Sequence, residues 1–205
     1  YFYLLSDLRH AKHDDRTLEG DALRAIPQAR RARVLRRWIG ALGLPPLPGN
    51  GIARIETDLL PARTDAEACF EWSGARIRRW RNLLHADAMR EAFPVHWAQA
   101  WDGAGPLWLP TGDTLELVGV DGFDAPLRVH ARHGGERIVL PGRGHSHALK
   151  HVLQEAGIPP WRRAPLPLLS SADGTLQAAG DAIRSASLTD WLHTRAARLH
   201  WSGLA

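Results

Sequence analysis

Several residue types are scarce in this 205-residue chain. The single cysteine, Cys69, excludes a disulfide-stabilised scaffold and fits a reducing, cytoplasmic environment. Long apolar runs are also missing: the longest uncharged stretch, residues 38–53, contains three prolines and four glycines, which excludes a membrane-spanning helix. Tyr1 is not followed by the basic segment, apolar segment and small-residue cleavage site of a signal peptide, so we expect the chain to be a fragment of a longer protein.

Lysine is almost absent. Only Lys12 and Lys150 are lysines, so arginine supplies 24 of the 26 basic residues, which exceed the 22 acidic residues by four. These arginines are grouped along the chain: residues 24–37 hold six and residues 76–81 hold four, both without an acid, and residues 128–163 hold seven basic residues against two acids. Basic blocks of this kind are typical of proteins that bind a polyanion.

The order of the predicted elements indicates an α+β chain with two small domains. In the first half, apolar residues at helical spacing between Pro27 and Gly43 predict an amphipathic helix. Residues 1–21 and 52–60 are also predicted to be helical. Three short strands with a β-meander connection are expected at residues 69–72, 75–80 and 83–86.

A stretch rich in proline, glycine and tryptophan, residues 87–112, is predicted to be irregular and to contain the domain boundary. We place a helical domain with the meander at residues 1–108 and a β-rich domain at residues 109–205. In the second domain, Ser146 is expected to cap one main helix, with Gly157 as its stop. Its strands are expected at residues 115–120, 127–131, 138–140, 166–170 and 176–179, and residues after Ile183 give no clear pattern.

Two features are candidates for binding phosphate in the first domain. Arg30, Arg33, Arg36 and Arg37 lie on a predicted helix without acids nearby in sequence, so their charge is unbalanced unless an outside anion or a distant carboxylate supplies it. The alternative is a solvated helix face. On the predicted middle strand, Arg78 and Arg79 point to opposite faces, so at most one of them shares a surface with Arg76.

In the second domain, the loop of residues 142–144 leads to the predicted helix. Its glycines allow close approach to an anion, and a helix N-terminus would supply free N–H groups. Arg143, His145 and Lys150 would add donors on the same edge. The alternative is an ordinary loop-to-helix connection. A-form RNA is recognised mainly through phosphates, 2′-hydroxyls and shape, so a basic loop and helix edge suits an RNA stem.

Other chemistries fit the sequence poorly. Five histidines lie between His130 and His151, but zinc sites need three or four ligands with cysteine or carboxylate help, and Cys69 is expected to be a buried strand residue in the other half. Ser170 and Ser171 are expected in a turn without a base or an orienting acid. We therefore expect neither a catalytic nor a metal-binding residue. Trp161 is expected to anchor the loop after Pro160.

A series of short motifs occurs in order within residues 132–169: Gly-Gly-Glu-Arg at 134–137, Gly-Arg-Gly-His-Ser at 142–146, Leu-Lys at 149–150, Gln-Glu-Ala-Gly at 154–157, Pro-Pro-Trp at 159–161 and Pro-Leu-Leu at 167–169. This series resembles the C-terminal tRNA-recognition domain of bacterial tRNA(Ile)-lysidine synthases, in which a second lysine is usual at the position of His151. The first half is similar to the middle domain of that family, through residues 29–31, 35–38, 42–45 and 77–80.

The resemblance implies an activity for a larger enzyme. Members of the family use ATP to activate the wobble cytidine of the AUA-reading isoleucine tRNA, which has a CAU anticodon, and join free lysine to it. Their adenylating domain carries a Ser-Gly-Gly-x-Asp-Ser motif that is absent from these residues. The resemblance therefore implies that this chain binds and orients tRNA, is not catalytic alone, and uses no cofactor itself, since ATP and lysine belong to the catalytic domain.

The residues expected to contact tRNA are the basic side chains of both domains. They are Arg30, Arg33, Arg36, Arg37 and Arg78 in the first domain and Arg137, Arg143, His145, Lys150, Arg162 and Arg163 in the second. Two alternatives stay open: a module that binds an acidic protein, and a metal-dependent hydrolase that uses the histidines. The sequence also leaves open whether the chain dimerises.

Overall fold

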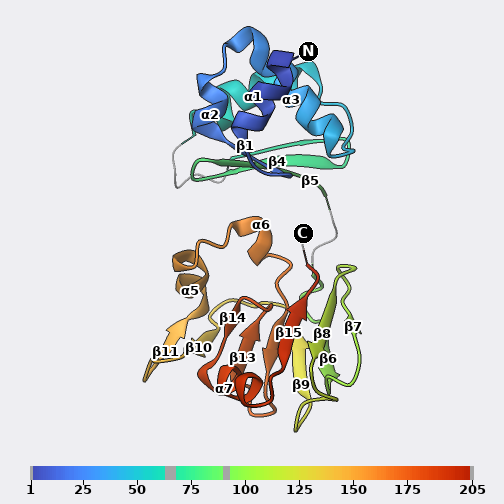
Figure 1. Cartoon of the computed structure of the whole chain (residues 1–205), viewed down its shortest axis with the longest axis vertical. Helices are drawn as coiled ribbons and strands as arrows, with labels where there is room; N and C mark the ends of the chain where they lie inside the picture. Colours follow the sequence, from blue (N-terminus) through green and yellow to red (C-terminus); the bar gives the residue numbers. More distant parts are fainter. Residues whose placement is uncertain (1, 63–67, 90–92, 204–205) are drawn as a thin grey trace. The chain divides into compact units, whose positions relative to one another are not determined.

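A computed structural model describes residues 2–62, 68–89 and 93–203 of the chain. It divides into two compact units, Tyr1–Arg90 and Glu91–Ala205 (Figure 1). Each unit has its own hydrophobic core. The architecture is mixed α and β with several antiparallel sheets, which confirms the predicted fold class. Within the described residues, no helix is both long and apolar enough to cross a membrane.

In the first unit, helices cover one face of an antiparallel sheet (Figure 1). The helices are α1 (Phe2–Ala11), α2 (Gly20–Ala25), α3 (Gln28–Ala41) and α4 (Gly49–Arg54), and α4 continues into a π-helical turn, η1 (Ile55–Leu59). The strands are β1 (Lys12–Asp14), β2 (Thr17–Glu19), β3 (Cys69–Trp72), β4 (Ala75–Trp80) and β5 (Leu83–Ala88), in the order β1-β2-β5-β4-β3.

Helix α3 forms as its sequence predicts. Its first N–H groups need no helical partner, so Pro27 is tolerated at its start. Val34, Leu35, Trp38 and Ile39 are fully or almost fully buried, and together they form the apolar stripe of the helix. Gly43, with φ +67°, adopts the left-handed conformation that ends the helix.

The predicted meander is confirmed as β3, β4 and β5, but the sheet is wider than the sequence indicates. Residues 12–19, which we expected to be helical, form the β1–β2 hairpin, and β2 pairs with β5. Leu18 of β2 is completely buried and contributes to the same core as Leu84 of β5. The core therefore recruits this hairpin to the sheet, a tertiary effect that local pattern cannot show.

In the second unit, a five-stranded sheet has the order β14-β13-β12-β9-β6, a three-stranded sheet has the order β15-β8-β7, and β10 pairs with β11. The strands are β6 (Ala98–Trp101), β7 (Leu107–Trp108), β8 (Thr114–Val118), β9 (Leu127–His130), β10 (Arg137–Val139), β11 (Ser146–Ala148), β12 (Leu168–Ser170), β13 (Leu176–Ala179), β14 (Ile183–Arg184) and β15 (Arg198–Trp201). The helices are α5 (Leu149–Glu155), α6 (Pro160–Arg163) and α7 (Ala186–Thr194).

The unit boundary differs from the one expected after residue 108. It lies between Arg90 and Glu91, because residues of the supposed linker belong to the second core. β6 pairs with β9, and Trp101 and Leu107 are buried in that core. Burial of Trp101, Leu107 and Leu109 in this core outweighs the high proline and glycine content of the stretch.

The start of the main helix also differs from the prediction. Ser146 is not its cap: it lies in β11, opposite Val139 of β10, and the N-cap position is Ala148 without a side-chain bond. The end of α5 is as predicted, since Gly157 has φ +69° and the N–H of Ile158 donates to the carbonyl of Leu153 at 3.0 Å.

Candidate nucleic-acid interface

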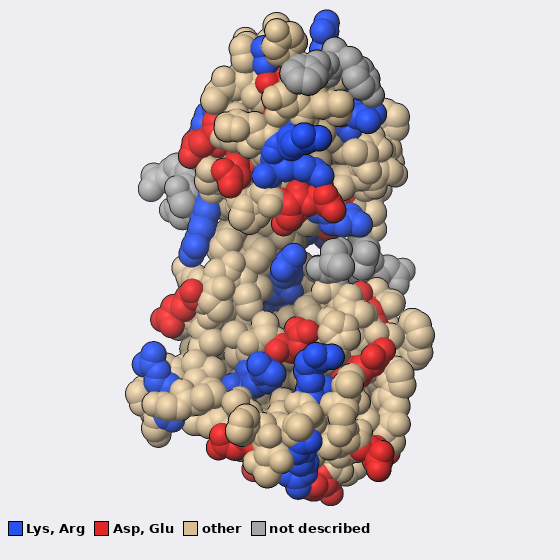
Figure 2. All heavy atoms as spheres, viewed as in Figure 1, with Lys and Arg blue, Asp and Glu red and all other residues tan. Residues whose placement is uncertain are grey.

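On the face drawn in Figure 2, Lys and Arg side chains alternate with Asp and Glu side chains over both units. Each predicted cation therefore has to be judged by its own contacts.

Half of the arginines in residues 24–37 are used inside the first unit. Arg30 of α3 binds Asp7 of α1, with Nε 2.9 Å from Oδ2. Arg31 lies 3.5 Å from Glu56 and also donates to the backbone carbonyls of residues 23, 24 and 26, where helix α2 ends. Arg24 pairs with Asp21. Carboxylates that are distant in sequence thus supply much of the negative charge that residues 24–37 lack.

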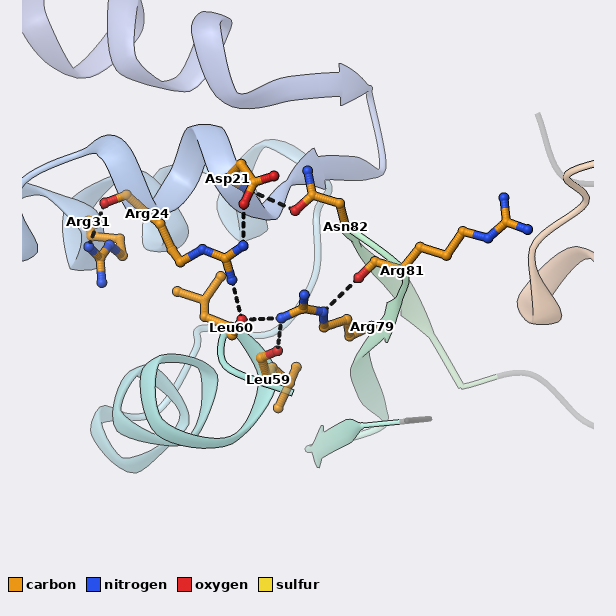
Figure 3. Close-up of polar contacts among 8 residues, drawn as sticks. All are labelled: Asp21, Arg24, Arg31, Leu59, Leu60, Arg79, Arg81 and Asn82. Carbon is orange, nitrogen blue, oxygen red and sulfur yellow. Dashed lines mark hydrogen bonds and ion pairs between the residues drawn. The ribbon is translucent and has the colours of Figure 1, made fainter. Parts of the chain in front are cut away.

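A second internal cluster joins η1 to the sheet (Figure 3). Arg79 donates to the carbonyl of Leu59 at 2.6 Å and also to the carbonyl of Leu60. Arg24 donates to the same Leu60 carbonyl. These bonds satisfy carbonyl groups at the end of the π-helical turn. Burial lowers the pKa of the Arg79 guanidinium, whose side chain is on the core face of β4. Arg79 is therefore a structural residue.

The remaining arginines of α3 face solvent. Arg33, Arg36 and Arg37 are exposed and follow one another at positions i, i+3 and i+4, so they share one side of the helix, opposite the buried stripe. In the described part of the chain, none of the three guanidinium groups forms a hydrogen bond or an ion pair. These three residues are called the α3 arginine stripe below.

On β4, the alternation of faces is confirmed. Arg76 and Arg78 lie on the face away from the helices and both bind Asp87 of β5, at 3.1 Å and 2.9 Å. Desolvation lowers the pKa of Arg78, while the Asp87 carboxylate beside it acts in the opposite direction. Because Asp87 bridges the two guanidinium groups, Arg78 is less available to an outside phosphate than the α3 arginine stripe.

In the second unit, basic side chains line the β10–β11 hairpin and helix α5. Arg137 bridges the hairpin: its Nε donates to the Ser146 hydroxyl at 2.9 Å, and its side chain remains exposed. Arg143 lies in the exposed connecting loop, and Lys150 is exposed on α5. The ring of His145 lies 4.4 Å from that of His147. These residues, Arg137, Arg143, His145 and Lys150, are called the hairpin group.

The predicted anion cradle at a helix N-terminus is not formed. β11 separates the glycine loop from α5, and the first N–H of α5 already donates to the carbonyl of Glu136 at 2.8 Å. Gly142 has φ +71° and serves the hairpin turn instead. The hairpin group offers side-chain donors on an exposed hairpin.

Arg162 and Arg163 of α6 have different environments. Arg162 is exposed, whereas Arg163 is half-buried and donates through Nε to the carbonyl of Ile158 at 2.5 Å. Trp161, which precedes them in α6, is 4% exposed, which fits its expected anchoring role. Arg163 therefore holds the loop before α6.

Two expectations about reactive residues were wrong. Cys69 is in the predicted strand but is exposed. Ser170 lies in β12 rather than in a turn, and its hydroxyl is 2.9 Å from Nε2 of His130. The side chains of Ser170 and His130 are both buried, so a substrate does not reach this pair in the structure. Among the five histidines, His147 lies in β11 and His151 in α5, and the described residues contain no group of three or more metal-ligand side chains.

Each unit matches a model of the same family. Residues 18–85 match the TilS substrate binding domain, and residues 127–201 match the TilS substrate C-terminal domain. A tRNA(Ile)-lysidine synthase from Xylella fastidiosa is 50% identical over 192 residues, which are 91% of this chain and 44% of that protein. The chain belongs to the tRNA(Ile)-lysidine synthase family.

Other relatives from this family give the same coverage. The synthase of Xanthomonas campestris is 49% identical over 92% of this chain and 43% of its own length, and that of Yersinia pseudotuberculosis is 31% identical over 86% and 44%. The chain thus spans less than half the length of these synthases, in the part that carries the substrate-binding and C-terminal domains.

One motif of this family has a structural role that sequence reasoning missed. In the Gly-Gly-Glu-Arg turn, Oε1 of Glu136 accepts from the N–H groups of His133 and Gly134 at 2.5 and 2.7 Å. Gly134 and Gly135 both have positive φ, which the tight turn requires. The partners Asp7, Glu56 and Asp87 were also missed, because they are far from their arginines in sequence.

Proposed function

We propose that this chain binds and orients tRNA for a lysidine-forming ligase. In this proposal the whole enzyme uses ATP to activate the wobble cytidine of the isoleucine tRNA with a CAU anticodon and joins lysine to it. The chain holds the tRNA in the cytoplasm and takes no catalytic part itself.

The observation that carries the proposal is the pair of domain matches, one to each unit, in a single family of tRNA-modifying enzymes. The exposed cations add physical support. The α3 arginine stripe in one unit and the hairpin group in the other present side chains that have no carboxylate partner among the described residues. Phosphate contacts supply most of the affinity for RNA, and an A-form stem needs no base-specific group for binding.

A titration of the chain with the isoleucine tRNA, over a series of salt concentrations, tests the proposal. We expect affinity to fall steeply as salt rises, because phosphate neutralisation releases counterions. A salt-independent affinity would contradict the proposal. A methionine tRNA with the same anticodon is the comparison: equal affinity would place discrimination between the two outside this chain.

The non-catalytic part of the proposal has a separate test. The chain is incubated with ATP, lysine and the isoleucine tRNA, and lysidine is measured by mass spectrometry of the digested RNA. We expect none above the level without protein, and lysidine formation by the chain alone would overturn this part.

A further inference from the structure

The most exposed large apolar side chain in the described residues is Trp108 of β7, at 72%. All nine tryptophans lie in the described ranges, and the other eight are buried or partly buried. Alternation along the strand sends Leu107 and Leu109 into the core and leaves the Trp108 indole on the outer face of the β15-β8-β7 sheet. Core packing therefore does not explain this tryptophan.

The same sheet face carries polar and basic side chains. Thr114 is opposite Trp108, and its hydroxyl is 3.0 Å from that of Ser202. Exposed and buried side chains alternate along β15: Arg198 and His200 are exposed, and Leu199 and Trp201 are buried. Ser202 and Arg198 are four residues apart, which is about 13 Å along an extended strand. The face thus presents an indole at one end and a guanidinium at the other.

A hollow of about 320 Å³ opens beside the start of β7. It is lined by the loop of residues 103–106 and by Glu116, Leu117, Val120 and Asp121. Strand pairing of Leu107 with Leu115 sets Pro106 beside Glu116, so the hollow begins two residues from Trp108. The loop is held by Trp101, whose Nε1 donates to the carbonyl of Gly105 at 2.8 Å.

These groups match an unpaired nucleotide better than a helical stem. An exposed aromatic ring on a sheet is the usual stacking partner of a splayed base. Carboxylates such as Glu116 and Asp121 repel phosphate, but they accept hydrogen bonds from the exocyclic amino groups of bases. A phosphate of the same strand would then lie at Arg198, which is opposite Val118 on β8, two residues along that strand from Glu116.

We propose that the outer face of the β15-β8-β7 sheet binds unpaired nucleotides of the tRNA 3′ end. The Trp108 indole stacks on one base, the carboxylates of Glu116 and Asp121 accept from an amino group of a base in the hollow, and Arg198 contacts the backbone. The proposal rests on the proposed function. The 3′ end is the occupant because it is the unpaired continuation of a stem, and the hairpin group that suits a stem is in the same unit.

The test compares three variants of the full chain at an exposed position, where folding is not at risk. Trp108→Ala removes the stacking surface, Trp108→Phe keeps an aromatic face, and Trp108→Leu keeps an apolar side chain without one. We expect Trp108→Ala and Trp108→Leu to lower tRNA affinity by about 5- to 150-fold, the usual effect of losing one stacked base, and Trp108→Phe to retain most of it. The slope of affinity against salt should not change, because no charge is removed.

The second arm uses tRNA trimmed of its four unpaired 3′ nucleotides. Wild type and Trp108→Ala should bind this RNA equally, since the stacking partner is missing. Unchanged affinity of Trp108→Ala for intact tRNA, or an equal loss with trimmed tRNA, would overturn the inference. A Trp108→Leu variant that binds tRNA like wild type would show that stacking is not required and would also overturn the inference. A Trp108→Ala protein that differs from wild type only in self-association would assign the indole to protein contact instead. In each of these cases salt-dependent binding by wild type would still support the proposed function.

Discussion

Arg30 on α3 binds Asp7 on α1 through two guanidinium nitrogens, although 23 residues separate them in sequence. The Asp7 side chain is only 15% exposed, and the Arg30 guanidinium also lies 5.7 Å from the ring of Tyr3. The Asp7 hydrogen bond is the main reason why the pKa of Arg30 is raised. Two of the five arginines of α3, Arg30 and Arg31, thus bind other elements of the unit, and the other three face solvent.

The division predicts opposite effects for neighbouring arginines. Arg33→Ala, Arg36→Ala and Arg37→Ala should each lower the magnitude of the log–log salt slope of tRNA binding by about 0.7–0.9 and leave the melting temperature unchanged. Arg30→Ala should lower the melting temperature, because Asp7 loses its partner, with a smaller effect on the slope. Fluorescence anisotropy and thermal melts measure the two quantities. A slope that responds only to Arg30 would contradict the assignment.

The hairpin group gives a similar prediction for the second unit. Arg143→Ala and Lys150→Ala should each reduce the salt slope by about 0.7–0.9, because each exposed cation neutralises one phosphate. Arg163→Ala is the matched control, since its guanidinium holds the carbonyl of Ile158. We expect it to change stability rather than slope. If Arg143 and Lys150 leave both affinity and slope unchanged, the hairpin is not part of the interface.

Arg79 should be a main determinant of stability in the first unit. Arg79→Met leaves the carbonyls of Leu59 and Arg81 without this donor in a buried site, and each unsatisfied buried group costs about 1–3 kcal/mol. We therefore expect a loss of about 2–5 kcal/mol in the free energy of unfolding, measured with urea. Arg36→Met, at an exposed position, should change it by less than about 0.5 kcal/mol. Similar unfolding midpoints for the two variants would show that the Arg79 bonds are dispensable.

Acid should destabilise the first unit through His85. Burial lowers its pKa from the ordinary 6.5 to about 4, and its Nδ1 lies 3.2 Å from the Thr17 hydroxyl. In the unfolded chain His85 binds a proton near pH 6.5, whereas in the folded chain it stays neutral until the pH is near 4. The contribution of neutral His85 to the free energy of unfolding is therefore complete above pH 6.5 and is lost as the pH falls toward 4. The shift corresponds to about 3 kcal/mol.

Urea unfolding of wild type and His85→Gln at pH 7.5 and pH 4.5 measures this effect. The variant should lose less stability between the two pH values. The stability of the variant should still depend on pH to some extent, because burial also lowers the pKa of His130 in the second unit. Equal losses in both proteins would assign the acid sensitivity to other groups.

Elements with a strong local pattern could be predicted from the sequence. The apolar spacing of α3, the alternation in β4 and the stop at Gly157 depend on neighbours a few residues away, and the structure contains all three. The assignment of Ser146 as a cap was wrong because pairing with β10 provides more backbone hydrogen bonds than a cap does. The strands β6 and β7 were missed because their partners, β9 and β8, follow later in the chain.

The sequence by itself determined the family, the mixed α and β class and the abundance of arginine, because each is carried by residue identity or by short-range periodicity. Only the tertiary structure decided which arginines are available to an outside anion. That depends on carboxylates and carbonyls brought close by folding: Asp7 for Arg30, Asp87 for Arg78 and the end of η1 for Arg79. The strength of an ion pair depends on distance in space, and sequence separation does not report that distance.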